Sequence, residues 1–484
     1  MSAEEVDVLI LGAGLSGIGM AAQLARRCPG KRFVVLERRA RVGGTWDLFR
    51  YPGVRCDSDM FTLGYAFRPW TGTRTIADAA SIRQYIEDVA REHGVLERVR
   101  FGHRVVRSSW SSRDSRWTVT AALEDGGESR TFHARFVVDC SGFYDYDRGH
   151  RPRFEGESDF EGRIVHAQSW DPGYDFADQR VVVVGSGATA VTMVPTIAQR
   201  AAHVTMLQRS PAYLIAVPSH DATVRVADRW LPHGAVASLV RARNTALQLA
   251  LFELSRRRPE MVRRLLLGQV KRRLGDSADM RDFTPSYAPW DQRPCVVPDG
   301  DFFRAIRAGR ASVVTDHITR FERNEIALRS GRRLPADLVV LATGFELALG
   351  GGAALEVDGR EVVRSERLTY RSTLVEGVPN FAMVFGYVNV SWTRKADLVS
   401  EYVCRLLQHL DRTGCRQVTP RGGAGFASDE AFVPIRSGYV SRGARVMPRQ
   451  GRGGPWRARQ NVFYDLLTLR WAPLRDRYLE FSPG

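Results

Sequence analysis

The sequence predicts an α/β fold with two Rossmann-like dinucleotide-binding domains, the second inserted into the first, and with a helical excursion in the second. Two observations predict this fold. A short apolar run opens into a glycine-rich turn twice, at residues 8–17 and again at residues 181–190. The chain has 484 residues, which exceeds the size at which a single hydrophobic core stops growing.

The first glycine turn belongs to a complete βαβ pattern. An apolar strand at residues 8–11 precedes the turn, a helical stretch follows it at 18–26, and a second apolar strand at 33–36 ends at Glu37. The residues of the GxGxxG turn that we expect to bind a nucleotide are Gly12, Gly14, Ser16 and Gly17.

Each glycine of this turn has a physical reason. Gly12 allows a tight turn, Gly14 lets the backbone approach a pyrophosphate, and Gly17 lets the helix pack closely on the strand. The pyrophosphate would lie at the helix N-terminus, where free N–H groups favour an anion. Glu37 can accept hydrogen bonds from ribose hydroxyls, so we expect a nucleotide with a free ribose at this first site.

The second turn is a GxGxxA variant after a strand at residues 181–184. Its expected cofactor-binding residues are Gly185, Ser186, Gly187, Ala188, Thr189 and Ala190. The next strand, at 204–207, leads not to an acid but to Gln208, Arg209 and Ser210. Because a guanidinium suits a 2′-phosphate, Arg209 and Ser210 predict NADPH at the second site.

Two further strands indicate where the chain passes between the domains. Residues 136–142 and 337–345 each resemble a strand that ends in small residues and glycine. We therefore expect the first domain over residues 1–150, the second over 151–340, and the rest of the first domain with a C-terminal tail over 341–484. Residues 220–290 are expected to form a mostly helical excursion in the second domain.

The formal charge of +16 could indicate a nucleic-acid or membrane partner. Arginines are scattered along the whole chain, and the densest basic run, 256–273, has apolar residues at helical spacing. This run predicts one amphipathic helix with a solvated basic face, and we expect no nucleic-acid partner. The polar residues 1–7 and the lack of a long apolar run predict a cytoplasmic protein without integral membrane insertion. Six cysteines without metal-ligand spacing predict reduced thiols and no metal site.

Two longer patterns resemble the fingerprints of type I Baeyer–Villiger monooxygenases, which are class B flavin-containing monooxygenases. Residues 43–57 fit GGxWxxxxYPGxxxD, and residues 160–171 fit FxGxxxHxxxW(P/D). The fixed residues of the second pattern are Phe160, Gly162, His166, Trp170 and Asp171. Other stretches, such as 57–64 and 289–293, are most similar to the ethionamide-activating subgroup, and the likeness runs from about residue 5 to 465.

The resemblance implies FAD at the first site, NADPH at the second, and O2 as co-substrate. It implies a C4a-peroxyflavin that converts a small hydrophobic ketone to an ester or lactone, and oxidation of sulfides as well. It also implies that Val105 backs the adenine of FAD and that residues 55–57 face the nicotinamide. The residues that it places along these cofactors are Gly44, Thr45, Trp46, Asp47, Leu48, Arg55, Cys56 and Asp57.

Arg293 matches the active-site arginine of the family, and we expect its permanent charge to stabilise negative charge in the reaction. Asp57 would hold Arg293 through an ion pair. Gln292 stands where many members have lysine, so NADPH preference would depend more on Arg209, with modest discrimination against NADH. His166 is expected to act structurally between the domains, and Trp46 and Trp170 are expected to pack or to lie at the flavin edge.

Several alternatives remain from the sequence. An N- or S-oxygenating flavin monooxygenase uses the same cofactors, and a catalytically silent redox sensor could bind the same nucleotides. A disulfide reductase is disfavoured because Cys56 has no neighbouring cysteine. The walls of the substrate pocket are expected from residues 220–290, 350–352 and 387–392.

Overall fold

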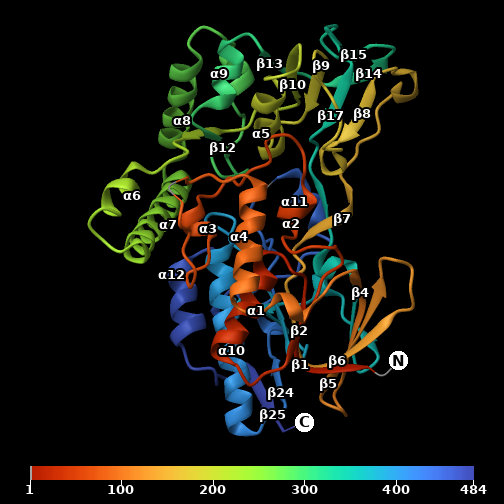
Figure 1. Ribbon diagram of the computed structural model, residues 1–484, viewed down its shortest axis with the longest axis vertical. Helices are drawn as coiled ribbons and strands as arrows, with labels where there is room; N and C mark the ends of the chain where they lie inside the picture. Colours follow the sequence, from red (N-terminus) through yellow and green to blue (C-terminus); the bar gives the residue numbers. More distant parts are fainter. Residues whose placement is uncertain (1–2, 73, 436, 484) are drawn as a thin grey trace.

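Two sheets divide the computed structural model, which describes residues 3–72, 74–435 and 437–483, into a lower and an upper half (Figure 1). The lower sheet has eleven strands, and its main path runs β20-β19-β4-β5-β6-β1-β2-β3. Its strands are β1 (Glu4–Leu11), β2 (Phe33–Leu36), β3 (Val99–Arg100), β4 (His103–Ser111), β5 (Arg116–Leu123), β6 (Arg130–Asp139), β19 (Ala354–Val357), β20 (Arg360–Glu361), β21 (Thr369–Tyr370), β22 (Leu374–Val375) and β23 (Phe381–Met383).

β1 is the centre of the parallel part of the lower sheet. It pairs with β2 on one side and with β6 on the other, both in parallel, and β23 then pairs with β6. The helices of this half are α1 (Leu15–Arg27), α2 (Thr45–Leu48), α3 (Met60–Leu63), α4 (Ala79–Glu92), α10 (Thr393–Thr413), α11 (Gly438–Gly443) and α12 (Val462–Asp465). Two short strands, β24 (Gln417–Pro420) and β25 (Leu479–Ser482), pair near the C-terminus.

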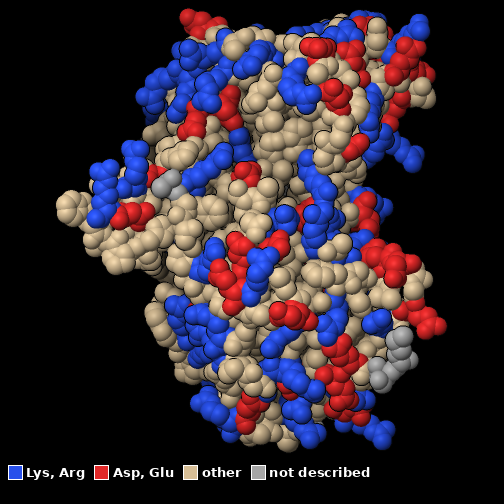
Figure 2. All heavy atoms as spheres, in the orientation of Figure 1, with Lys and Arg blue, Asp and Glu red and all other residues tan. Residues whose placement is uncertain are grey.

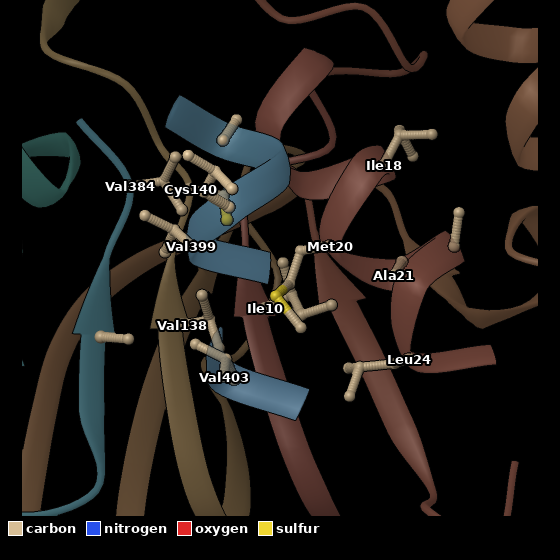
Figure 3. Close-up of a cluster of buried hydrophobic side chains, with 14 of the residues drawn as sticks. Ile10, Ile18, Met20, Ala21, Leu24, Val138, Cys140, Val384, Val399 and Val403 are labelled. Carbon is tan, nitrogen blue, oxygen red and sulfur yellow. The ribbon is translucent and has the colours of Figure 1, made fainter. Parts of the chain in front are cut away.

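The core of the lower half lies between this sheet and the helices α1 and α10. Figure 3 shows Ile10 of β1 and Val138 of β6 beside Met20 of α1 and Val403 of α10. All four side chains are fully buried. Two segments almost 400 residues apart in sequence therefore cover the same face of the sheet.

The upper sheet is entirely parallel, in the order β13-β10-β9-β17-β8. Its strands are β8 (Arg163–His166), β9 (Arg180–Val184), β10 (His203–Gln208), β13 (Ala311–Thr315) and β17 (Leu338–Leu341). α5 (Ala188–Ile197) and α9 (Asp301–Arg307) pack beside it, with β11 (Leu214–Val217) paired to β12 (Cys295–Pro298). A small antiparallel sheet follows in β14 (Ile318–Glu322), β15 (Glu325–Leu328) and β16 (Arg333–Pro335).

The upper sheet interrupts the lower one between β6 and β19, which confirms the predicted fold class of one Rossmann-like unit inserted into another. The two passages of the chain are β7 (Tyr144–Gly149) and β18 (Phe345–Leu347), which pair with each other in antiparallel fashion. The boundaries at residues 150 and 340 stay predictions, and they fall close to these two strands.

The helical excursion forms as predicted, in α6 (Ala222–Ala227), α7 (His233–Arg257) and α8 (Pro259–Leu274). The amphipathic helix predicted over 256–273 is confirmed for most of its length by α8, but the helix begins at Pro259 and not at Arg256. α7 ends at Arg257, and α8 begins at Pro259, because proline fits the first position of a helix but disrupts an interior one. Within the described residues, no helix combines the length and the apolar character that crossing a bilayer requires.

The packing of α1 on β1 predicts that an alanine at position 17 is destabilising. A Cβ atom on Gly17 would lie 1.8 Å from the carbonyl oxygen of Gly12, so the helix must move away from the strand. We expect Gly17→Ala to lower the free energy of unfolding by about 1–3 kcal/mol, measured by urea denaturation. Gly30→Ala is the matched control, because its Cβ would meet nothing within 4 Å. Equal stability of the two variants would contradict this packing.

Candidate active site

A single cavity of about 1170 Å³ includes both glycine turns in its wall. Gly12 and Gly14 border it from the lower half, and Gly185 and Gly187 border it from the upper half. The carboxyl ends of parallel strands from both sheets point to this cavity. Proteins with α/β sheets bind their ligands at these strand ends.

The first turn presents an open helix end to the cavity. Gly14 is the N-cap of α1 and no side chain caps it, so first-turn N–H groups are available to an anion. Gly12 has a φ of +96°, and a Cβ there would lie 2.9 Å from the carbonyl oxygen of Cys140. Gly44 approaches Gly14 just as closely, since its Cβ would lie 2.9 Å from the Gly14 Cα. A backbone cradle of this kind leaves room for a pyrophosphate.

Glu37 lies at the end of β2, buried beside the first turn. One carboxylate oxygen accepts a hydrogen bond from the Ala13 N–H at 2.7 Å, and the other accepts from the Arg39 N–H at 2.8 Å. Burial raises the pKa of Glu37, and the two backbone donors oppose this shift. The backbone therefore fixes the orientation of the carboxylate, and each of its oxygens keeps a lone pair for another donor.

The second turn repeats this arrangement at α5. Gly187 is the uncapped N-cap of the helix, and a Cβ on it would meet nothing within 4 Å. Gly185, with a φ of +142°, packs so closely that its Cβ would lie 2.3 Å from the carbonyl oxygen of Ala342. Ser186, Ala188 and Thr189 also line the cavity.

Arg209 and Ser210 follow β10 and are exposed at the edge of the cavity. Gln208, just before them, turns inward and donates hydrogen bonds to the Asp282 carbonyl at 2.7 Å and to Thr315 Oγ1 at 2.9 Å. Among the described residues, no carboxylate forms an ion pair with Arg209. Arg442 of α11 lines the same cavity, and its pKa is lowered by burial and by the charge of nearby Arg209. The sequence did not predict this second guanidinium at the site.

Arg293 and Asp57 meet in the cavity wall from opposite halves of the molecule. Arg293 Nε lies 3.2 Å from Asp57 Oδ2, and Arg293 Nη2 donates to Asp57 Oδ1 and to Ser58 Oγ, both at 3.3 Å. Roughly a third of each side chain is exposed, so both groups can reach a ligand. The arginine follows Trp290, a residue with a φ of +68°.

The other predicted cofactor residues divide into two sets. Ser16, Thr45, Trp46, Cys56 and Val105 line the cavity, and the Trp392 Nε1–H donates to Ser16 Oγ at 2.8 Å. The predicted residues that do not line the cavity are Gly17, Asp47, Leu48, Arg55 and Ala190.

The predicted residues away from the cavity have structural contacts instead. Asp47 is buried and pairs with Arg39 at 2.7 Å, and Arg55 pairs with Asp301 of α9. Leu48 packs against the hydrophobic core of the upper half, and Ala190 is buried in that core. Arg55 therefore links the two halves on one side of Asp57, while Arg293 links them at Asp57 itself.

The fingerprint residues 160–171 lie outside the cavity wall. Trp170 packs edge-on against Phe176, and Phe160 packs edge-on against Phe321. Gly162 allows close contact with the carbonyl oxygen of Asp337, and Asp171 accepts a hydrogen bond from the Gly173 N–H.

His166 is the fingerprint residue nearest the passage between the halves. A Cβ on Gly149, the last residue of β7, would lie 1.9 Å from Cε1 of His166. His166 Nδ1 accepts a hydrogen bond from the Gln168 N–H at 3.1 Å, and burial lowers its pKa. These contacts fit the expected structural role at the crossing.

The expected pocket walls need one correction. Residues 350–352 line the cavity, as do Tyr387, Val388 and Trp392, but no residue of 220–290 does. The excursion packs on α3 and β11 instead. Its place in the wall is taken by a C-terminal segment whose lining residues include Val433, Ile435, Val440 and Met447.

Three thiols also line the cavity, from Cys56, Cys140 and Cys295. Burial raises the pKa of Cys56 to about 12 and that of Cys295 to about 12. All three are free thiols. The place of Cys295 beside Cys56 in one wall was not predictable from the sequence, because 239 positions separate them in the chain.

Comparison with known proteins identifies the family of this chain. The sequence profile described as flavin-binding monooxygenase-like matches residues 75–349, and the profile of an NAD(P)-binding Rossmann-like domain matches residues 10–69. The putative FAD-containing monooxygenase MymA of Mycobacterium tuberculosis is 49% identical, over 99% of this chain and 98% of its own. The FAD-containing monooxygenase EthA of Mycolicibacterium smegmatis is 45% identical, over 99% of this chain and 97% of its own.

Solved structures share the fold at lower identity. Steroid monooxygenase bound to NADP has a TM-score of 0.76 at 22% identity, with 99% of this chain and 100% of that chain covered. Cyclohexanone monooxygenase from Rhodococcus sp. Phi1 has a TM-score of 0.78 at 18% identity, with both chains fully covered. The expectation of a flavin monooxygenase is confirmed. The predicted cofactors, FAD and NADPH, are confirmed as well. The chain belongs to the flavin-binding monooxygenase-like family.

Proposed function

We propose that this chain is an FAD- and NADPH-dependent Baeyer–Villiger monooxygenase, which inserts one oxygen atom of O2 beside the carbonyl of a small hydrophobic ketone. The product would be an ester or a lactone. The observation that carries the proposal is the Arg293–Asp57 pair in the wall of a cavity that also holds both glycine turns. We retain the cytoplasm as the proposed location.

FAD fits the first turn. The uncapped N-terminus of α1 offers N–H groups to its pyrophosphate, and the fixed carboxylate of Glu37 offers lone pairs to its ribose hydroxyls. A Cβ atom on Gly12 or on Gly44 would lie 2.9 Å from a neighbouring backbone atom, so a larger residue at either position would displace the backbone around the turn. When bound, FAD supplies the hydride acceptance and the oxygen activation that no side chain of this protein provides.

NADPH fits the second turn by the same reasoning. The uncapped N-terminus of α5 would hold its pyrophosphate. Arg209 and Ser210 would hold the 2′-phosphate, with Arg442 as a second cationic donor in place of the lysine that Gln292 replaces.

Arg293 would stabilise charge on the substrate. Addition of a nucleophile to a ketone places negative charge on the former carbonyl oxygen, and a fixed guanidinium lowers the energy of that charge. Asp57 and Ser58 accept hydrogen bonds from Arg293, which limits the positions that its side chain can adopt. Asp57 is therefore proposed as the positioning residue, and Arg293 as the catalytic one.

Oxygenation of sulfides or amines is the alternative reaction. Oxygen transfer to sulfur or nitrogen creates no negatively charged carbonyl oxygen, so it depends less on Arg293. The aromatic side chains of Phe143 and Phe385 in the cavity wall suit a hydrophobic ketone or sulfide. The two reactions can therefore be separated by how strongly each responds to a change at position 293.

We expect Arg293→Ala to lower the rate of ester formation by about 100–1,000-fold, while NADPH still bleaches the flavin absorbance. Ester and sulfoxide products from a mixed panel of ketones and sulfides would be measured by gas chromatography. Arg180→Ala is the matched control, since Arg180 pairs with Asp337 outside the cavity. Undiminished ester formation would remove Arg293 from the mechanism, and equal losses of ester and sulfoxide would remove its proposed selectivity for the carbonyl.

The nucleotide preference predicts a second result. Arg209→Ala removes a charge-assisted contact to the 2′-phosphate, so the KM for NADPH should rise about tenfold or more, while the KM for NADH changes little. Steady-state NADPH and NADH oxidation would be compared. Arg200→Ala serves as control, because Arg200 pairs with Asp175 away from the cavity. If both cofactors were affected equally, Arg209 would not recognise the phosphate.

The cavity thiols should be inert. With pKa values of about 12, Cys56 and Cys295 carry almost no thiolate at pH 8. Iodoacetamide should modify both thiols at least about 100-fold more slowly in the native protein than in the unfolded protein. The labelled fraction of each would be measured by peptide mass spectrometry. Partly exposed Cys415 is the internal control. Rapid labelling at both positions after reduction with NADPH would instead indicate a redox pair and a disulfide reductase.

A further inference from the structure

The helical excursion carries most of the large hydrophobic side chains that are exposed among the described residues. Of the fourteen large hydrophobic side chains exposed among the described residues, eight lie between residues 222 and 274. They are Val226, Trp230, Leu231, Leu239, Leu247, Leu254, Met261 and Leu265. α6 and α7 project from the body at the left of Figure 1. Such a concentration of apolar side chains on a surface indicates an interaction site.

α7 is apolar on two faces. Its inner face packs Val236, Ala237 and Val240 into a buried cluster with Phe61. Its outer face presents Leu239 and Leu247, with 63% and 61% of their surface exposed. Exposed alanines at 242, 246 and 250 continue this outer face at helical spacing toward Leu254. A helix that merely covered the body would present polar residues there.

Positive charge accompanies the apolar side chains. Residues 233–274 contain ten lysines and arginines against two glutamates, a net charge of +8. Three consecutive exposed arginines, Arg256 to Arg258, separate Leu254 from Met261 at the break between α7 and α8. In Figure 2 the projection shows uncharged side chains along its lower edge and Lys and Arg along its upper edge.

A second apolar element lies against the start of α10. α12 and the π-helical turn η9 (Leu466–Trp471) expose Phe463, Leu467 and Trp471. Lys395 and Asp397 anchor the two elements to the first turns of α10. Asp397 accepts a hydrogen bond from Arg241 of α7 at 2.8 Å, and Lys395 donates one to Asp465 of α12 at 2.8 Å. The two apolar elements therefore contact the same end of α10.

We propose that the outer face of α6, α7 and α8, together with η9, docks on the surface of an anionic lipid bilayer. The leucines and tryptophans would enter the boundary between headgroups and acyl chains of the bilayer, and the arginines would contact the lipid headgroups. A second copy of this chain is disfavoured, because a symmetric contact would bring two +8 surfaces together. Nucleic acid is disfavoured because it offers no apolar phase for the exposed leucines. This inference does not depend on the proposed reaction.

The test uses the full-length, FAD-loaded protein in flotation with large unilamellar vesicles. One set contains phosphatidylcholine alone, and the other contains equal parts of phosphatidylcholine and phosphatidylglycerol. We expect flotation with the anionic vesicles only, weakened by high salt. The triple variant Leu239→Ser, Leu247→Ser, Leu254→Ser should lower the vesicle-bound fraction about tenfold or more, with unchanged flavin content and circular dichroism.

Two controls keep the outcome decisive. The double variant Phe101→Ser, Val363→Ser removes exposed apolar side chains elsewhere and should float like the unaltered protein. Absence of flotation with anionic vesicles would overturn the proposal. Flotation of the triple variant equal to that of the unaltered protein would overturn it too. So would a third result, in which the unaltered protein binds no vesicles and light scattering shows a dimer that the triple variant loses.

Discussion

A close contact between backbone atoms at each glycine turn constrains the rest of the cavity. Gly17 lets α1 approach the carbonyl of Gly12, and Gly185 lets the second turn approach the carbonyl of Ala342. Because both contacts are between backbone atoms, no side-chain adjustment can relieve a larger residue there. The two contacts thus fix where the free N–H groups of α1 and α5 point, and both point into one volume.

Several direct links join the halves that carry these turns, among them the Arg55–Asp301 ion pair and the packing of Phe49 and Tyr51 into the core of the upper half. β7 and β18 form the covalent connections, His166 packs against the end of β7, and Arg293 reaches Asp57 across the cavity. A partly exposed ion pair contributes little to stability, on the order of 1 kcal/mol or less. The main effect of the Arg293–Asp57 pair is therefore to hold the positive charge of Arg293 in a defined position. Its contribution to the stability of the contact between the halves is small.

The sequence predicted those features that depend on local pattern. β2 has its predicted bounds, and Glu37 and Arg209 both lie at the cavity, because strand, glycine turn, helix and strand are read from adjacent residues. The proximity of Arg293 to Asp57 came only from the family resemblance, since 236 positions separate the two residues. The place of Cys295, of Arg442 and of Val433 to Met447 in the wall could not be predicted, because each depends on contacts between distant segments.

The error about the excursion has a different cause. Helical periodicity shows that a helix has an apolar face, but not which surface that face meets. Residues 220–290 were expected to enclose a substrate, yet the inner face of α7 covers Phe61 and its outer face remains exposed. Arg241, buried and bonded to Asp397, ties α7 firmly to α10. A buried arginine–carboxylate pair breaks only at considerable cost, so α7 is held in place while its outer leucines stay in solvent. Such a fixed, exposed apolar face is better explained by a surface that it meets than by a cavity that it would close.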